Sequence, residues 1–185
     1  MLILVGVGLL AACAEGPAAP TMVGSVTSAR APNGGYSLGP GDKLRLIVFG
    51  EDNLSGEFSV SASGLLAFPL IGEIPAKGRT VEEVRADVEQ KLDVRYVRKP
   101  RVSLEIITYR PYYILGEVNK PGEYPFEPDL TVLAAVASAQ GFTYRANVRR
   151  VFIKHGGEGG EAVFSLTGDL EVRPGDVIRV SERHF

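Results

Sequence analysis

The chain has 185 residues, of which 45% are hydrophobic and 23% are charged, and these proportions exclude both wholesale disorder and a protein with several membrane spans. Its 20 basic and 22 acidic residues give a formal net charge of -2, so it lacks the basic excess of a nucleic-acid-binding protein and no nucleic acid is expected as a partner. One cysteine and two histidines exclude an intramolecular disulfide and disfavour a tetrahedral zinc site. We therefore expect neither a metal nor another cofactor.

The amino terminus has the pattern of a lipoprotein signal peptide. Residues 2–10 form an unbroken apolar run that is too short to span a bilayer, and Leu10-Ala11-Ala12-Cys13 follows it. This tetrapeptide resembles the bacterial lipobox, which implies cleavage after residue 12 and lipid attachment at Cys13. A short buried helix with an incidental cysteine is the alternative, but capping and amphipathic patterns are absent.

Residues 13–35 are predicted to be a lipidated flexible linker. The segment is rich in Ala, Gly, Pro, Ser and Thr and has no apolar period. A random coil of this length spans about 26 Å, which is enough to hold a folded body near a membrane. Bacterial lipoproteins that are retained at the inner membrane commonly carry Asp directly after the lipidated cysteine, but this chain has Ala14 there. The resemblance therefore implies an outer-membrane anchor, with the body in the periplasm.

From Tyr36 onward, short apolar alternations separated by turn residues predict strands. A capping box of Thr80 and Glu83 precedes apolar residues at helical spacing and predicts a first helix, whose buried face includes Val84, Val88 and Leu92. The expected strands in this half lie at 43–49, 57–61, 65–68 and 101–107, the last with Val102, Leu104 and Ile106 on one face.

The second half repeats this organisation. A second helix is expected at about 131–140, with strands at 112–118, 149–154, 161–165 and 176–180. The helical spacing of Leu130, Leu133, Ala134 and Ala137 predicts its buried face. The fold class is therefore α+β, with two small domains at 36–110 and 111–185 that divide near Arg110-Pro111.

A Pro-Gly-Asp corner precedes an alternating strand in both halves. The first corner is Gly39-Pro40-Gly41-Asp42 and the second contains Pro174, Gly175 and Asp176. Proline sets φ at the second turn position and glycine accepts a positive φ at the third, so both predict type II turns. We expect the aspartates to bond only turn amides, a simpler explanation than catalysis.

Three stretches resemble a known family. Residues 36–46 (YSLGPGDKLRL) resemble the opening motif of the polysaccharide export domain of Wza-type bacterial export proteins, and residues 68–74 and 78–83 resemble its continuation. Residues 113–124 (YILGEVNKPGEY) are similar to the start of a soluble-ligand-binding β-grasp (SLBB) domain. The resemblance extends from Tyr36 to about Val180, and the lipobox agrees with it.

The resemblance implies a non-catalytic, lipid-anchored protein whose copies form a homo-oligomeric ring. Such a ring conducts capsular polysaccharide or exopolysaccharide across the envelope together with an inner-membrane polysaccharide co-polymerase. Because the chain stops at Phe185, we expect a short form with one SLBB domain that relies on a separate outer-membrane barrel or another component. The alternative is a periplasmic lipoprotein that binds or senses a small soluble ligand or sugar.

Two clusters remain as candidate contact sites. Arg95, Arg98, Lys99 and Arg101 form a basic run that would suit an acidic polymer or partner, although a solvated helix end explains it more simply. Tyrosines at positions 109, 112 and 113 flank the expected domain joint, where interface packing is favoured over sugar stacking.

The sequence gives little support to an enzyme. His155 and His184 are the available histidine bases, and neither lies in a recognisable catalytic motif. His155 precedes a glycine-rich run that predicts a hairpin tip, so we expect its side chain to be exposed.

Overall fold

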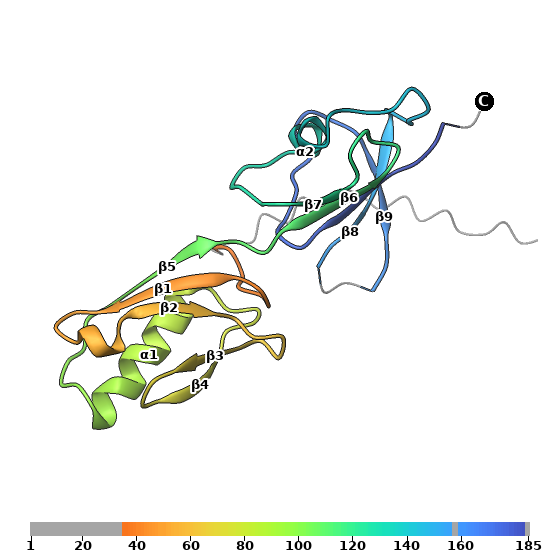
Figure 1. The fold of residues 1–185 in the computed structure, drawn as a ribbon. Helices are drawn as coiled ribbons and strands as arrows, with labels where there is room; N and C mark the ends of the chain where they lie inside the picture. Colours follow the sequence, from red (N-terminus) through yellow and green to blue (C-terminus); the bar gives the residue numbers. More distant parts are fainter. Residues whose placement is uncertain (1–34, 157–158, 184–185) are drawn as a thin grey trace, which may run out of the picture.

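The computed structural model describes residues 35–156 and 159–183, and this part of the chain contains ten strands and two α-helices in two units (Figure 1). Each unit has its own hydrophobic cluster. The first cluster draws its buried residues from between Leu38 and Leu104, and the second from between Tyr112 and Val180. The predicted α+β class is confirmed. Cys13 and His184 lie outside the described residues.

The N-terminal unit packs a three-stranded antiparallel sheet and a two-stranded hairpin around one helix. Its elements are β1 (Lys43–Val48), a 3-10 turn (Asp52–Leu54), β2 (Gly56–Ser59), β3 (Leu65–Phe68), β4 (Gly72–Pro75), α1 (Val81–Arg95) and β5 (Val102–Thr108). The sheet has the order β2-β1-β5, and β3 pairs with β4. Buried and exposed residues alternate along β1, as expected when one face of a sheet covers the core.

Helix α1 begins where its sequence pattern predicts. The Thr80 hydroxyl accepts a hydrogen bond from the Glu83 amide, and the Glu83 carboxylate accepts one from the Thr80 amide. Val84, Val88 and Leu92 are completely buried. The predicted capping box and the predicted helical face are both confirmed.

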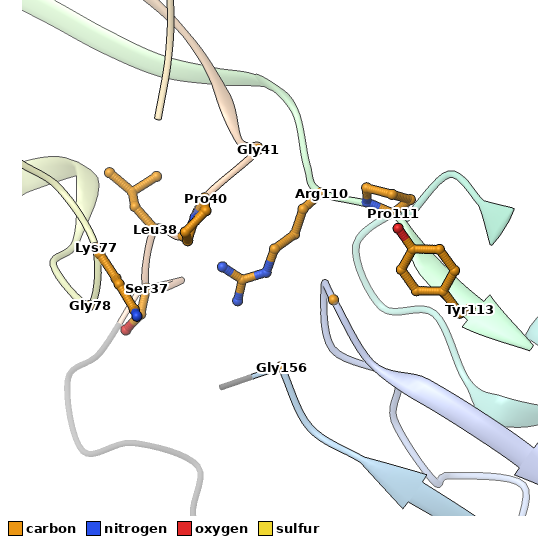
Figure 2. A pocket seen from close by; sticks show the side chains of 12 residues that line it. Ser37, Leu38, Pro40, Gly41, Lys77, Gly78, Arg110, Pro111, Tyr113 and Gly156 are labelled. Carbon is orange, nitrogen blue, oxygen red and sulfur yellow. The ribbon is translucent and has the colours of Figure 1, made fainter. Parts of the chain in front are cut away.

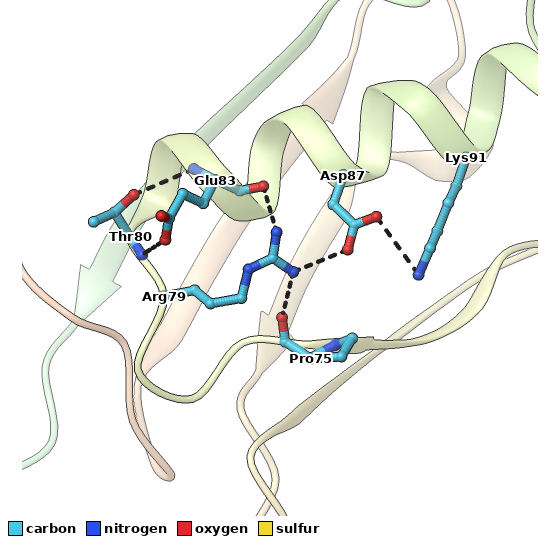
Figure 3. Close-up of polar contacts among 6 residues, drawn as sticks. All are labelled: Pro75, Arg79, Thr80, Glu83, Asp87 and Lys91. Atoms are coloured by element: carbon cyan, nitrogen blue, oxygen red, sulfur yellow. Dashed lines mark hydrogen bonds and ion pairs between the residues drawn. The ribbon is translucent and has the colours of Figure 1, made fainter.

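Arg79 attaches the end of the hairpin to this helix (Figure 3). Its guanidinium donates to the Pro75 carbonyl at 3.0 Å, the Asp87 carboxylate at 2.9 Å and the Glu83 carbonyl at 2.9 Å. Asp87 also pairs with Lys91 at 3.7 Å. These contacts fix the short loop between β4 and α1 against the helix.

The C-terminal unit packs one helix against a five-stranded mixed sheet. Its elements are β6 (Tyr112–Gly116), β7 (Gly122–Tyr124), α2 (Val132–Ser138), β8 (Arg150–Lys154), β9 (Ala162–Ser165) and β10 (Val177–Val180). The sheet has the order β7-β6-β10-β8-β9, in which β10 runs parallel to β6 and antiparallel to β8.

The strands predicted from alternation are confirmed to within one or two residues at their ends. β4, β7 and the 3-10 turn were missed because they are short, and both strands contain glycine or proline, which weaken a strand pattern.

The predicted buried face of the second helix is wrong. This helix is apolar on nearly every side, so two different sets of its residues are spaced as one helical face. The buried face consists of Val132, Ala135, Val136 and Ala139, whereas Leu133, Ala134 and Ala137 are exposed.

The two Pro-Gly-Asp corners have the same backbone structure. Gly41 has φ of +96° and Gly175 has φ of +83°. In each corner the aspartate amide donates to the carbonyl three residues earlier, at 3.1 Å in both cases. These are the predicted type II turns, and they need glycine because a positive φ strains other residues.

The prediction that Asp42 and Asp176 bond only turn amides is wrong. Both carboxylates are completely buried, and each does accept the amide three positions earlier, at 2.7 and 2.8 Å. Asp42 also accepts the Tyr36 hydroxyl at 2.7 Å and the Arg110 amide at 2.9 Å. Asp176 bonds Nδ1 of His155 at 2.9 Å. A buried carboxylate needs such additional partners because burial removes its water.

Aromatic packing connects the two units. The Tyr109 ring lies 5.0 Å from that of Tyr36 in the N-terminal unit and 5.5 Å from that of Phe126 in the C-terminal unit, both edge to face. Tyr112 is buried in the C-terminal cluster and stacks on Tyr124. The predicted packing role is thus confirmed for Tyr109, whereas Tyr112 belongs to a core.

We predict that Asp42→Ala lowers the free energy of unfolding by about 3 kcal/mol, because three donors lose a buried acceptor. Urea denaturation followed by circular dichroism measures the change. Glu73→Ala, which removes an exposed carboxylate, is the control and should change stability by less than about 0.5 kcal/mol. Equal midpoints for the two variants would contradict the role given to Asp42.

A second prediction concerns alkaline pH. Burial, followed by the hydrogen bond to Asp42, raises the pKa of the Tyr36 hydroxyl above its ordinary value. The unfolded chain ionises this group near pH 10 while the folded chain keeps its proton, so the stability that it contributes falls as pH rises further. Tyr36→Phe should therefore flatten the decline in unfolding free energy between about pH 9 and pH 11.

The control for this experiment is Tyr144→Phe, which removes a hydroxyl from a residue that is 83% exposed. Unfolding free energies measured at several pH values give the slopes. If parent and Tyr36→Phe declined in parallel, the proposed coupling between Tyr36 ionisation and folding would be refuted.

Candidate functional site

A cleft of about 600 Å³ lies between the two units, and we call it the joint cleft (Figure 2). The first Pro-Gly-Asp corner, the loop after β4, the connection between β5 and β6, and two glycines of the C-terminal unit form its walls. It is lined by Ser37, Leu38, Gly39, Pro40, Gly41, Lys77, Gly78, Arg110, Pro111, Tyr113, Gly156 and Gly175. Two of these residues are cationic and none is acidic.

Arg110 joins the two corners across this cleft. Its backbone amide donates to Asp42, and its Nε donates to the Pro174 carbonyl at 2.9 Å. Its Nη1 lies 4.0 Å from the Asp42 carboxylate, beyond hydrogen-bond distance. The side chain is only 22% exposed, yet both Nη groups have unused donor capacity.

The Arg110 side chain fits because glycines stand on both sides of it. A Cβ at Gly39 would lie 1.3 Å from Nη1, and a Cβ at Gly175 would lie 2.8 Å from Nε. The same glycine that the second turn requires for its positive φ therefore also makes room for the guanidinium.

Lys77 and Gly78 form a wall in the loop between β4 and α1. The Gly78 amide donates to the Leu38 carbonyl at 2.8 Å, which attaches this loop to the first corner. The stem of Lys77 packs over Gly64, where a Cβ would approach it to 2.5 Å. Within the described chain Lys77 has no acidic partner at ion-pair distance, so its ammonium group contributes positive charge to the cleft.

Tyr113 supplies the aromatic surface of the cleft. Its backbone amide donates to the Asp176 carbonyl at 2.8 Å, and its side chain is 40% exposed. The carboxylate of Glu123, its partner across β6 and β7, raises the pKa of the Tyr113 hydroxyl. The sequence led us to expect that Tyr113 packs at an interface, but its ring is partly exposed and lines the cleft.

The expectation that His155 is exposed is wrong. Its side chain is 17% exposed, bonds Asp176 through Nδ1 and packs edge to face against Phe164. Gly156, the next residue, lines the joint cleft. The buried carboxylate of Asp176 holds this histidine inward, because a buried acceptor without donors would be unstable.

The residues selected from the sequence fall in two places. Gly39, Pro40 and Gly41 line the joint cleft, and Asp42 lies buried behind them. Arg95, Arg98, Lys99 and Arg101, which we call the basic end, lie near the C-terminal end of α1, at the end of the N-terminal unit that is remote from the other unit (Figure 1).

The basic end is a surface of exposed charge beside exposed apolar side chains. All four basic residues are exposed, and the Lys99 amide donates to the Asp93 carboxylate at 2.7 Å. A neighbouring depression of about 300 Å³ is lined by Leu70, Ile71, Lys91, Val94, Arg95 and Tyr96. The structure leaves both expectations for this run open, namely a contact surface and a solvated helix end.

Sequence reasoning missed Lys77 and Arg110. The proline after Arg110 marked a joint but gave no indication of where the guanidinium would point. Among the described residues no cluster of three or more His, Cys, Asp or Glu side chains could hold a metal ion. No helix in the same residues is long and apolar enough to cross a membrane.

Two known families match two successive regions of the chain, in the same order as the two motifs in its sequence. Residues 30–107 match the family described as polysaccharide biosynthesis/export protein, and residues 111–163 match the SLBB domain. The Pro-Gly-Asp corner that opens the first unit lies within the first matched region, whereas the second corner lies after the end of the SLBB match at residue 163.

Three curated relatives are similar to the chain. The exopolysaccharide production protein ExoF of Rhizobium meliloti (strain 1021) is 38% identical over 127 residues, which cover 62% of this chain and 30% of ExoF. The EPS I polysaccharide export outer membrane protein EpsA of Ralstonia nicotianae is 28% identical over 165 residues, covering 82% and 42%. The polysialic acid transport protein KpsD of Escherichia coli is 27% identical over 94 residues, covering 50% and 17%.

The chain therefore spans less than half the length of these relatives. Its two matched domains and their order agree with the motifs at residues 36–46 and 113–124. These matches support a bacterial polysaccharide export protein of the Wza type.

Proposed function

We propose that this protein is a non-catalytic component that conducts capsular polysaccharide or exopolysaccharide across the cell envelope. The observation that carries the proposal is the export domain followed directly by an SLBB domain over residues 30–163. The names of three relatives, which concern exopolysaccharide production, polysaccharide export and polysialic acid transport, support the same role. In this proposal 36–110 and 111–185 are the two domains.

The proposed location is the outer membrane, with a lipid at Cys13, residues 1–12 removed as a signal peptide, and 13–35 as the tether. The body then lies in the periplasm. The lipobox pattern supports the anchor, and the name of EpsA as an outer membrane protein supports the membrane.

The proposed assembly is a ring of identical copies that meets an inner-membrane co-polymerase and a separate outer-membrane barrel. A closed ring requires heterologous contacts, in which different surfaces of neighbouring copies meet. Exposed apolar side chains at Val94 and Tyr96 beside the basic end provide one such surface. The contact between Arg110 and both corners supports a fixed angle between the domains, which a repeating interface needs.

A second candidate function is binding of a small ligand or sugar by a periplasmic lipoprotein. The joint cleft favours it, because ligand sites occur preferentially between domains and have volumes in this range. The two functions differ in assembly, since a conduit needs a multimer and a binding protein works as a monomer.

We predict that the full-length lipidated protein, extracted in detergent, forms one discrete multimer of acylated chains. Native mass spectrometry measures both the subunit number and the added lipid mass. Cys13→Ala should lose the lipid mass, because the thiol is the proposed attachment atom. An acylated monomer, also in the presence of the inner-membrane partner, would contradict the conduit and favour the binding protein.

We also predict that replacing all four residues of the basic end with glutamine lowers polysaccharide secretion at least about threefold, because clustered charge promotes encounter with an acidic polymer or partner. Secreted polymer and the native mass of the complex are the measurements. The matched control replaces four exposed basic residues elsewhere, namely Lys43, Lys120, Arg149 and Lys154. Parental secretion and assembly in the first variant would leave a solvated helix end as the explanation.

A further inference from the structure

The lining of the joint cleft carries positive charge and no negative charge, because it has two cations and no acid. The Asp42 carboxylate behind it accepts three neutral donors and lies 4.0 Å from Nη1 of Arg110, whereas Lys77 has no acidic partner at ion-pair distance among the described residues. Nε of Arg110 is occupied by the Pro174 carbonyl, so the Nη edge of the guanidinium is the part that remains for a ligand. In Figure 2 this group lies in the middle of the cleft, with Lys77 and Ser37 on one side and Tyr113 on the other.

This arrangement suits a carboxylate better than a phosphate. The planar donor fork of arginine matches a carboxylate, and Lys77 adds a second positive charge. Phosphate sites commonly rely on backbone amides that point at the ligand, often from glycines. Four glycine amides of this lining instead donate within the protein: Gly39 to Asp42, Gly41 to Val60, Gly78 to Leu38 and Gly175 to Pro111.

The remaining walls suit the body of a sugar ring. Pro40, Pro111 and the exposed face of Tyr113 provide apolar contact, and Ser37 provides a hydroxyl. Apolar walls with a few convergent polar groups are typical of small-ligand sites, and a volume of about 600 Å³ accommodates one or two sugar units.

We infer that the joint cleft binds a carboxylate-bearing sugar unit, with the Nη edge of Arg110 and the ammonium of Lys77 on the carboxylate and Tyr113 against the ring. The inference rests on the proposed function in taking the ligand to be a saccharide. It assigns to that function a substrate class, acidic polysaccharide, and a site remote from the basic end.

The test is isothermal titration calorimetry on the full-length protein at low ionic strength. The ligands are sodium glucuronate, a tetrasaccharide that contains glucuronate, neutral glucuronamide and glucose. We expect saturable binding of the first two and at least about tenfold weaker binding of the neutral sugars, because a charge-assisted hydrogen bond is lost. Tighter binding of the tetrasaccharide identifies a unit within a polymer, and equal or better binding of the monosaccharide identifies a free sugar acid.

Three variants locate the binding in the cleft. Arg110→Lys keeps the charge but loses the fork, and we expect affinity for glucuronate to fall about tenfold. Lys77→Gln, at an exposed position, should weaken it about fivefold. Gly39→Ala displaces the guanidinium without removing its charge and should weaken binding as Arg110→Lys does. Lys120→Gln, an exposed lysine outside the cleft, is the matched control and should bind as the parent does.

Circular dichroism and thermal midpoints show whether each variant is folded, and Lys77→Gln decides the outcome if Arg110→Lys is not. Equal affinity for glucuronate and glucuronamide, parental affinity in Lys77→Gln, or no binding of either acidic ligand would overturn the inference. The proposed function fails separately, when deletion of the protein leaves polysaccharide secretion unchanged.

Discussion

The relation between the two domains depends on how Arg110 is held. Its backbone amide completes the set of donors around the buried carboxylate of Asp42 in the N-terminal unit, while its Nε donates to the Pro174 carbonyl in the C-terminal unit. The side chain passes between Gly39 and Gly175, where any Cβ would collide with it. A guanidinium that is mostly buried requires partners in fixed positions. One residue of the connecting segment therefore sets the position of both corners and so shapes the cleft between them.

The same corner is used twice but completed differently. Asp42 and Asp176 both accept a turn amide, and both are buried, so each needs further donors. Asp42 finds them in Tyr36 and Arg110, whereas Asp176 uses His155. Arg110 donates to Asp42 through its backbone amide and not through its side chain. Nη1 of Arg110 lies 4.0 Å from the carboxylate that fixes its backbone, beyond hydrogen-bond distance, and the two charged residues that line the cleft are both cationic.

Local rules predicted what depends on a few neighbouring residues. The positive φ of Gly41, the capping box at Thr80 and the buried side of α1 follow from turn geometry, capping and helical period. Contacts between distant residues did not follow. Arg110 lies 68 positions from Asp42 in sequence, and the inward position of His155 depends on a carboxylate 21 positions away. The buried face of α2 was ambiguous because the helix is apolar on most sides, so only the sheet it packs against selects Val132 and Val136.

A conduit places a physical limit on any site that contacts the transported polymer. Passage requires binding that is favourable enough to admit each unit and weak enough to release it. A single, mostly buried arginine fork with one exposed lysine satisfies this better than a closed phosphate nest, because few charge-assisted bonds form. In a ring of the proposed kind the weak site recurs in every copy, so the polymer is held by several contacts at once while each one exchanges rapidly. Four glycine amides of the lining donate within the protein, and for the proposed conduit this means that the cleft offers an anion fewer donors and holds it less tightly.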